Sequence, residues 1–463
     1  MRRLIPFLLA IALASGCMVG PKFKKTEWGT EARYRYSLDT TSKDSITSLK
    51  WWEVYQDTVL QSLIRTALAE NRDMQIALSR LMEAQYNVGY KKADLFPQFS
   101  YQGGASILNK TNSDMAESGT LLRENYTGFG TVAWELDFWG KYRHATRAAK
   151  AQMLATEEAK KLLTTSLVAQ VATLYFQLRG LDQQLEIARR TLMVRKESTR
   201  IITERFMGGE VSELDKFQAQ SQEAIAAALV PSLERQVAQT ENALSILLGK
   251  NPGTVTRGLD NLSQVFPLSI PEGLPSQLLA RRPDVRQTED LWIAQNEQIG
   301  VAQAMRFPSI SLTGLFGAAS QDLADITASG SVISYATGSI TGPLFYFGKN
   351  KRRVQMEREK TEQARLQYEK AVLNAFAEVE NALIASDTYR REYEARRMQA
   401  MASGGAARLS RERYDSGYTN YLELLDNERT ELDAQLLAAQ ALQYQLQSTV
   451  QLYKALGGGW EMQ

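Results

Sequence analysis

The chain has 463 residues, and its 54 lysines and arginines against 52 aspartates and glutamates leave a net charge of only +2. A chain without a strong basic field is not expected to bind nucleic acid. One histidine, His144, and one cysteine, Cys17, leave little material for a His-rich or Cys-rich metal site, a thiol nucleophile or a disulfide. No nucleophile–base pattern or phosphate-binding loop stands out. We therefore expect a protein that is not an enzyme and needs no metal or other cofactor.

The N-terminus has the pattern of a secretory signal. Arg2 and Arg3 precede an apolar run over residues 4–13 and three small residues. The apolar run is too short to remain as a membrane-spanning helix. Cys17 follows at the expected cleavage point and resembles the modified cysteine of bacterial lipoproteins, so we expect residues 1–16 to be a signal peptide. A signal peptide with an incidental cysteine is the alternative.

The first half of the mature chain alternates between two periodicities. Helical periodicity predicts a helix over residues 58–94 and stops before two expected strands at 99–108 and 126–137. The polar segment 109–125 between them is expected to be an exposed loop. No apolar window of about 20 residues follows the signal, so any membrane-spanning part is expected to consist of strands.

A long helical hairpin is predicted after these strands. Residues 141–206 contain no proline, and their apolar residues alternate at spacings of four and three, which is typical of a coiled-coil seam. The seam consists of Leu167, Val171, Leu174, Leu178, Leu181, Leu185, Ala188 and Leu192. Gly208 and Gly209 end this helix, and a returning helix is expected over residues 212–248, with a kink at Pro231.

The second half repeats the first at an offset of 208 to 211 residues. Phe96-Pro97 recurs as Phe307-Pro308, and Leu248-Gly249 recurs as Leu456-Gly457. The elements expected in the second half are a helix over 276–305, strands at 309–320 and 332–341, a helix over 349–414 interrupted near Gly404-Gly405, and a returning helix over 420–456. This gives a lipid-anchored segment at 17–57, repeat 1 at 58–249, a connector at 250–273, repeat 2 at 274–457 and a tail at 458–463.

Four strands cannot close a barrel by themselves, and unpaired strand edges are not tolerated in hydrocarbon. Several chains are therefore expected to share one barrel. The seams on the long helices need partners along their length for the same reason. A tube of helices that continues a tube of strands would act as a conduit.

Several motifs then support a resemblance to a known family. They are Cys-Met-Val-Gly-Pro at 17–21, Trp-Trp-Glu at 51–53, Trp-Glu-Leu-Asp-Phe-Trp-Gly-Lys at 134–141, Arg-Arg-Pro-Asp-Val-Arg-Gln at 281–287, Ile-Gly-Val-Ala at 299–302, Phe-Pro-Ser-Ile-Ser-Leu-Thr-Gly at 307–314 and Tyr-Asp-Ser-Gly-Tyr-Thr-Asn-Tyr-Leu-Glu-Leu-Leu-Asp at 414–426. Over essentially its whole length the chain resembles the TolC-like outer-membrane efflux family, in its NodT-like lipoprotein branch.

The resemblance implies an α+β membrane protein that forms a homotrimer. Three chains would share a 12-stranded β-barrel, four strands from each, in the outer membrane of a Gram-negative bacterium. A long α-helical coiled-coil barrel would continue it into the periplasm, and a lipid on Cys17 would anchor it to outer-membrane lipid. The implied partners are a periplasmic adaptor (membrane fusion) protein and an inner-membrane resistance-nodulation-division transporter.

The resemblance also implies a gate at the hairpin tips. The residues carried over to an acidic gate are Asp215, Tyr414, Glu423 and Asp426, and those carried over to the adaptor-docking tip are Gly208, Gly209, Gly417 and Tyr418. Three copies of the acidic residues around an axis would favour cations. Thr419 stands where the best-known gate has an arginine, so Arg411 and Arg413 are the candidate basic partners. On spacing alone the acids could simply be solvated charges near helix starts.

The function implied is a passive exit duct that conducts drugs or other small toxic compounds from a tripartite efflux system to the exterior. A duct for protein secretion has the same architecture and remains an alternative. A coiled-coil surface scaffold without a pore is a second alternative. The cargo is not readable from the sequence, because an exit duct selects little.

Overall fold

The computed structural model describes residues 18–25, 35–36, 50–110, 121–264 and 275–458. The predicted signal peptide and Cys17 lie outside the described residues. The chain divides into two compact units, of which the first comprises Met1–Glu27, Arg80–Glu157 and Gln287–Glu369, and the second Trp28–Ser79, Glu158–Arg286 and Lys370–Gln463. Each unit therefore draws on both halves of the sequence.

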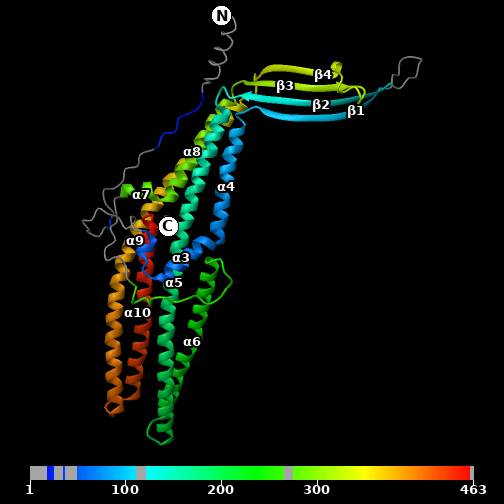
Figure 1. Ribbon diagram of the computed structural model, residues 1–463. Coiled ribbons are helices and arrows are strands. Elements are labelled where there is room, and N and C mark those ends of the chain that lie inside the picture. The colour runs from blue at the N-terminus through cyan, green and yellow to red at the C-terminus, as the bar shows by residue number, and fades with distance from the viewer. Residues whose placement is uncertain (1–17, 26–34, 37–49, 111–120, 265–274, 459–463) are drawn as a thin grey trace. The chain divides into compact units, whose positions relative to one another are not determined.

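The first unit contains a four-stranded antiparallel sheet in the order β1-β2-β3-β4 (Figure 1). Its strands are β1 (Gln98–Lys110), β2 (Leu121–Leu136), β3 (Ser309–Ser320) and β4 (Val332–Thr341). β3 and β4 have the predicted bounds. β1 and β2 are longer than predicted, because their pairing continues to Lys110 opposite Leu121. The expected loop at 109–125 is correspondingly shorter, and residues 111–120 lie outside the described residues.

The internal repeat extends to the register of the strands. Gln98 lies opposite Ala133 in β1–β2, and their counterparts Ser309 and Thr341 lie opposite each other in β3–β4. Even a cross-strand hydroxyl pair is repeated, because Ser100 and Thr131 lie 2.6 Å apart and their counterparts Ser311 and Ser339 lie 2.7 Å apart. The duplication is therefore structural as well as sequential.

The segment after Cys17 packs within the first unit. The amide of Val19 donates to the carbonyl of Trp139 at 3.2 Å, and the Lys25 ammonium pairs with Glu289 at 2.6 Å. The rings of Phe23 and Trp292 meet edge to face, 4.7 Å between centroids. Residues 18–25 are thus held against α8 (Pro283–Ala304) by polar and aromatic contacts.

Two helices that the sequence predicts as continuous are each broken. The predicted helix 58–94 consists of α3 (Thr58–Glu70) and α4 (Arg72–Ala93). Asn71 separates them, because its side chain accepts from the amide of Asp73 at 2.9 Å and donates to the carbonyl of Leu247 at 3.0 Å. A short helix, α2 (Trp51–Val54), precedes them.

The predicted helix 276–305 is likewise divided into α7 (Pro275–Arg281) and α8. Pro283 opens α8, and since proline has no amide hydrogen it cannot continue α7. The prediction of one continuous helix was therefore wrong at both places.

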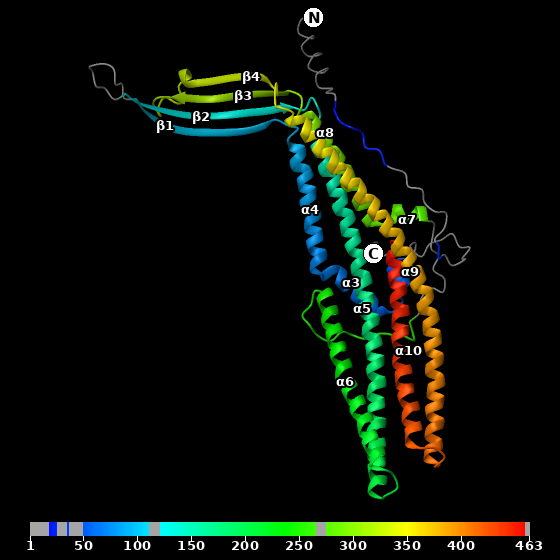
Figure 2. The same ribbon diagram turned by 180° about the vertical axis from the view of Figure 1, so that it is seen from behind.

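The long helices form two hairpins, α5 (Lys141–Met207) with α6 (Glu213–Leu247) and α9 (Lys349–Asp415) with α10 (Tyr421–Ala455) (Figures 1 and 2). The predicted interruption near Gly404-Gly405 was wrong, because α9 is continuous there. Packing against neighbouring helices can offset the roughly 1 kcal/mol cost of each glycine in a helix. Pro231 lies inside α6.

The coiled-coil seam of α5 is confirmed. Leu167, Val171, Leu178, Leu181, Leu185 and Ala188 are buried, while Leu174 and Leu192 are partly buried. Among the described residues, no helix has the length and apolar character that a membrane crossing requires.

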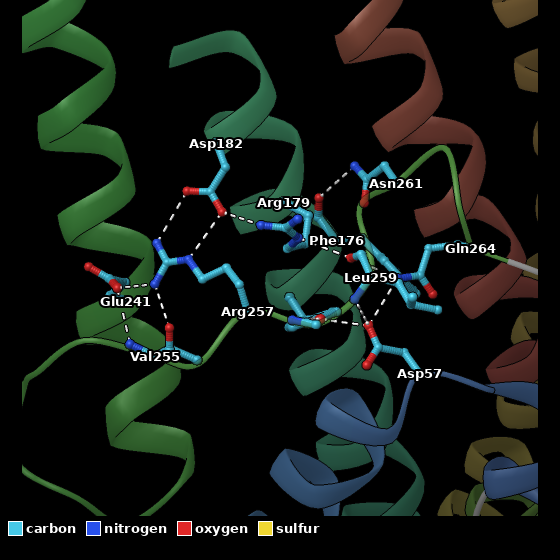
Figure 3. Close-up of polar contacts among 12 residues, drawn as sticks. Asp57, Phe176, Arg179, Asp182, Glu241, Val255, Arg257, Leu259, Asn261 and Gln264 are labelled. Atoms are coloured by element: carbon cyan, nitrogen blue, oxygen red, sulfur yellow. Dashed lines mark hydrogen bonds and ion pairs between the residues drawn. The ribbon is translucent and has the colours of Figure 1, made fainter. Parts of the chain in front are cut away.

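A polar cluster fixes the connector to the second unit (Figure 3). The carboxylate of Asp57 is buried and accepts hydrogen bonds from the Tyr175 hydroxyl at 2.6 Å and the Leu259 amide at 2.9 Å. Arg257 pairs with Asp182 at 3.1 Å and also with Glu241. Residues 255–264 are thereby tied to α3, α5 and α6, although no regular element forms there.

Candidate functional site

The two hairpin tips turn in the same way. The amide of Gly209 donates to the carbonyl of Phe206 and the amide of Gly417 donates to that of Tyr414, both at 3.0 Å. Gly209 has a φ of 74° and Gly417 a φ of 76°, in the left-handed region that glycine adopts without strain. α5 and α9 have the same length, 67 residues each, so these turns start the returning helices at equivalent positions of the repeat.

Side-chain caps start both returning helices. Ser212 and Asp215 form a capping box at α6, in which the Asp215 carboxylate accepts from the Ser212 amide at 3.1 Å and the Ser212 hydroxyl at 2.8 Å. Asn420 caps α10 by accepting from the Glu423 amide at 3.0 Å. Asp215 therefore has a structural partner on its own helix, and its part in a gate remains a prediction.

An aromatic cluster joins the two hairpins near the tips. Tyr421 is buried with Ile202, Ala219 and Leu424, and Tyr414 packs against this cluster. The rings of Tyr414 and Tyr421 lie 5.5 Å apart, and burial raises the pKa of Tyr421 to about 12. Burial also raises the pKa of Tyr414. Both phenols are therefore neutral in the physiological pH range.

An ion cluster lies two turns further along α10. Glu428 accepts from Arg195 of α5 and from Arg411 of α9, and the side chains of Arg195 and Glu428 are only 5% and 7% exposed. Burial separates these charges from water, so each depends on its partner for stabilisation. Burial, followed by the charge of Glu428, raises the pKa of the nearby Glu431 carboxyl. The cluster links the first hairpin to the second inside one chain.

In the part of the chain that the structure describes, the predicted acidic residues have different partners. Glu423 accepts from the Thr419 hydroxyl and lies 3.7 Å from Arg413, while Asp426 pairs with Arg429 at 3.1 Å. Of the two candidate basic residues, Arg413 thus contacts a predicted gate acid. Arg411 instead contacts Glu428.

Sequence reasoning missed Arg195 and Glu428, although the pattern contains a signal for both. Arg195 continues the seam of α5 three residues after Leu192, at a position where an apolar residue is expected. Glu428 lies four residues after Leu424 and seven after Tyr421, on the buried face of α10. A charged residue at a seam position on each helix predicts a buried pair.

The tips also expose apolar side chains. These are Met207, Leu214, Tyr418 and Leu422. Leu214 and Leu422 are equivalent under the 208-residue offset, and each lies in the first turn of a returning helix. Among the described residues, no group of His, Cys, Asp or Glu could hold a metal ion.

Comparison with known proteins decides the family. Residues 63–250 and 274–458 match the outer membrane efflux protein family. The chain belongs to the outer membrane efflux protein family. It is 31% identical to the cation efflux system protein CusC of Escherichia coli, over 99% of both chains. It is 32% identical to the toluene efflux pump outer membrane protein TtgC of Pseudomonas putida, over 99% of this chain and 96% of that one.

Solved members of the efflux protein family have the same fold. The open-state structure of the Neisseria gonorrhoeae MtrE outer membrane channel aligns with a TM-score of 0.88 at 28% identity, covering 96% of this chain and 99% of that one. The resemblance and fold class predicted from the sequence are thereby confirmed, with four strands per chain. This protein is an outer-membrane channel of an efflux system and not an enzyme, and such channels need no cofactor. The relatives support efflux over protein secretion or a scaffold without a pore.

Proposed function

We propose that the protein is the homotrimeric exit duct of a tripartite efflux pump, docked by its tips to a periplasmic adaptor that is served by a resistance-nodulation-division transporter. The single observation that carries the gating part is the contact of the buried Glu428 carboxylate with the buried Arg195 and with the half-exposed Arg411. A buried carboxylate with two guanidinium partners fixes one arrangement of the two hairpins. Separating the hairpins would leave buried charges without partners.

We call the contact of Glu428 with Arg195 and Arg411 the latch, and the aromatic cluster adds a second contact to it. Tyr414 and Tyr421 fill the space between the hairpins on the tip side of the ion cluster. Opening by movement of one hairpin against the other would have to break both contacts together. We infer that adaptor docking supplies the free energy for this step, because only a partner that binds the open form better can shift the equilibrium.

The exposed apolar residues favour the tips as the docking surface. Leu214 and Leu422 provide two equivalent apolar contacts in each chain, and Gly209 and Gly417 keep the turns compact beside them. Three chains would then present six similar contacts. Glu423 and Asp426 are the residues proposed to form an acidic ring and to favour cations.

The cargo is proposed to be chosen by the transporter. CusC is named for cation efflux and TtgC for toluene efflux, yet the chain is 31% and 32% identical to them. Such similar identities to ducts named for different compounds support a duct that selects little. Cys17 is proposed to carry the lipid anchor, which mass spectrometry of the mature N-terminus tests.

Two measurements test the proposed function. Deletion of the gene should raise sensitivity to the cargo of the partner pump, and the purified protein should form low-conductance channels in planar bilayers. Loss of protein secretion with unchanged sensitivity to toxic compounds would instead favour a secretion duct. If neither the wild type nor variants of the latch conduct ions, the proposal of a channel is contradicted.

A further inference from the structure

A joint between the two repeats lies directly below the sheet, inside the first unit. The ring of Trp139 stacks on Phe307 with centroids 4.5 Å apart, and its indole nitrogen donates to the Pro308 carbonyl at 2.7 Å. One turn into α5, Nδ1 of His144 lies 2.5 Å from the Glu297 carboxylate. The imidazole rests on Gly300, where an added Cβ would come within 2.4 Å of the ring. Repeat 1 supplies one side of this intrachain joint and repeat 2 the other.

The internal repeat places the counterparts of five of these residues on the surface. At the offset of 208, Trp139 corresponds to Phe347 and His144 to Arg352; at the offset of 211, Phe307 corresponds to Phe96, Glu297 to Tyr86 and Gly300 to Gly89. The counterparts are exposed, with Phe347 at 85%, Phe96 at 58% and Tyr86 at 71%. Arg352 is exposed as well, and an added Cβ at Gly89 would meet nothing within 4 Å.

The exposed counterparts form two half-sites on each chain, one with Phe347 and Arg352 and one with Phe96, Tyr86 and Gly89. We propose that the first half-site of one copy binds the second half-site of another copy. This inference rests on the homotrimer of the proposed function and assigns its contacts below the sheet. In this proposal the joint between copies is formed by residues equivalent to those of the joint within each chain. Three intrachain and three interchain joints would then alternate around the trimer.

The substitutions between the two joints are chemically matched. Phe347 and Phe96 retain an aromatic pair where Trp139 and Phe307 stack. The His144–Glu297 pair is replaced by Arg352 and Tyr86, which form a cation–π pair when the guanidinium lies over the ring. Gly89 leaves the same open surface for the guanidinium that Gly300 leaves for the imidazole.

The charges around the two joints differ in a way that suits an interface between copies. In repeat 1, Lys141 pairs with Glu135 at 2.9 Å and Arg143 with Asp137 at 3.0 Å. The counterparts of these two acids are Pro343 and Phe345. The start of α9 thus keeps a basic sequence at 349–353, which includes Arg352, without the acids that neutralise its counterpart. In the proposed joint this positive charge would face Tyr86 of the second copy.

The edges of the sheet give the register of the same interface. β1 and β4 are the two edge strands among the described residues. In the pairing of β2 with β3, Phe129 lies opposite Gly317. Their counterparts are Thr337 on β4 and Ser106 on β1, so Thr337 of one copy is expected opposite Ser106 of the next.

One backbone feature distinguishes the half-site of Phe347 and Arg352 from its counterpart at Trp139 and His144. Gly140 and Gly348 have nearly the same φ, 82° and 80°, so both turns lead into their helices alike. Phe347, however, has a φ of 47°, which a non-glycine residue rarely adopts, and its ring packs on Phe345 at 4.5 Å. We expect Phe347 to leave this conformation when Phe96 of a second copy replaces Phe345 as its contact.

The register is tested by crosslinking the purified full-length protein. The double variant Ser106→Cys, Thr337→Cys should give covalent dimers and trimers with a short bifunctional thiol reagent, seen on a denaturing gel under reducing conditions. These crosslinked species should be absent when either cysteine is introduced alone. The matched control is Ala105→Cys with Thr337→Cys, because a shift of one residue turns the side chains to opposite faces of the sheet. If light scattering shows a trimer, and the control pair crosslinks while the test pair does not, the proposed register is wrong. Absence of any trimer contradicts the proposed function itself.

The cation–π pair is tested by a double-mutant cycle on the dissociation temperature of the trimer. Tyr86→Leu and Arg352→Gln should each lower this temperature, and the double variant should fall no further than the lower single variant. Arg358→Gln, an exposed arginine on the same helix, should leave it unchanged. An unchanged temperature in Arg352→Gln, or fully additive single effects, overturns the assignment.

Discussion

The guanidinium of Arg195 on α5 and the carboxylate of Glu428 on α10 form a buried ion pair that joins the two hairpins of one chain. Arg411 of α9 binds the other oxygen of the same carboxylate. Well-packed apolar residues often stabilise such a position as well or better, so a buried charge pair is more readily explained by a need for one defined arrangement. This favours the pair as the latch of the proposed gate.

Glu428→Gln is expected to loosen the latch. The substitution leaves the Arg195 guanidinium buried without a counter-charge, which typically costs about 3–5 kcal/mol. Conductance in planar bilayers should rise above that of the wild type, and the thermal unfolding temperature should fall. The control is Glu412→Gln, because Glu412 pairs with Arg408 at an exposed site. Equal conductance in the wild type and Glu428→Gln would count against the latch.

The acidic ring predicts a change in ion preference without a large loss of stability. Glu423 and Asp426 are bound through exposed ion pairs, which are worth about 0–1 kcal/mol each. Glu423→Gln with Asp426→Asn should reduce cation over anion permeability, measured from the reversal potential in a salt gradient. Asp215→Asn should instead weaken the α6 capping box, because the charged acceptor of the Ser212 amide is lost. A reversal potential unchanged by the double substitution would refute the ring.

Asp57→Asn is expected to destabilise the connector. The carboxylate uses both oxygens, because Oδ2 accepts from Tyr175, Leu259 and Gln264 and Oδ1 accepts from the amides of Val59 and Leu60. The amide of asparagine has only one acceptor oxygen, so the donors on one side lose their acceptor at about 1–3 kcal/mol each. Thermal unfolding followed by circular dichroism measures the loss. Asp433→Asn, at an exposed position of α10, is the control.

The same carboxylate predicts a pH dependence. Burial alone would raise the pKa of Asp57, but the hydrogen bonds from Tyr175 and Gln264 outweigh it and lower the pKa below the ordinary 3.8. A lowered folded pKa gives stability that is complete above pH 3.8 and is lost as the pH falls through the folded value. The difference in unfolding temperature between the wild type and Asp57→Asn should therefore narrow below about pH 4. A difference that widens on acidification would contradict this sign.

Two glycines with similar backbone angles should respond differently to alanine. Gly249 has a φ of 67° and an added Cβ would lie 2.3 Å from the Glu70 carbonyl oxygen, whereas at Gly209, with a φ of 74°, it would meet nothing within 4 Å. Both variants carry the left-handed cost of about 1–2 kcal/mol. Gly249→Ala should be the more destabilised in thermal unfolding, because the backbone of Glu70 must also move. Equal losses would show that this contact is not rigid.

Much of the fold was predictable because it rests on local periodicity. The alternation in β3, the four–three seam of α5 and the glycine turns at 209 and 417 each specify an element from neighbouring residues alone. The repeat offsets also carried the strand register, since Gln98 opposite Ala133 maps onto Ser309 opposite Thr341. The predicted helix continuity was wrong at Asn71 and Pro283, and the predicted interruption at Gly404 was also wrong. At these places a side-chain contact, the missing amide hydrogen of proline or helix packing decides, and periodicity does not.

The sequence by itself determined the duplication, the two hairpins, the four strands and the family, because these follow from spacing and motif. Only the tertiary structure decided which charges meet. Arg411 is adjacent to the predicted gate in sequence, yet it binds Glu428, and Glu428 in turn binds Arg195 from a helix 233 positions away. Such a pairing depends on which faces of distant helices pack together. Because a buried charge needs a partner, the fold is stable only when these two residues meet.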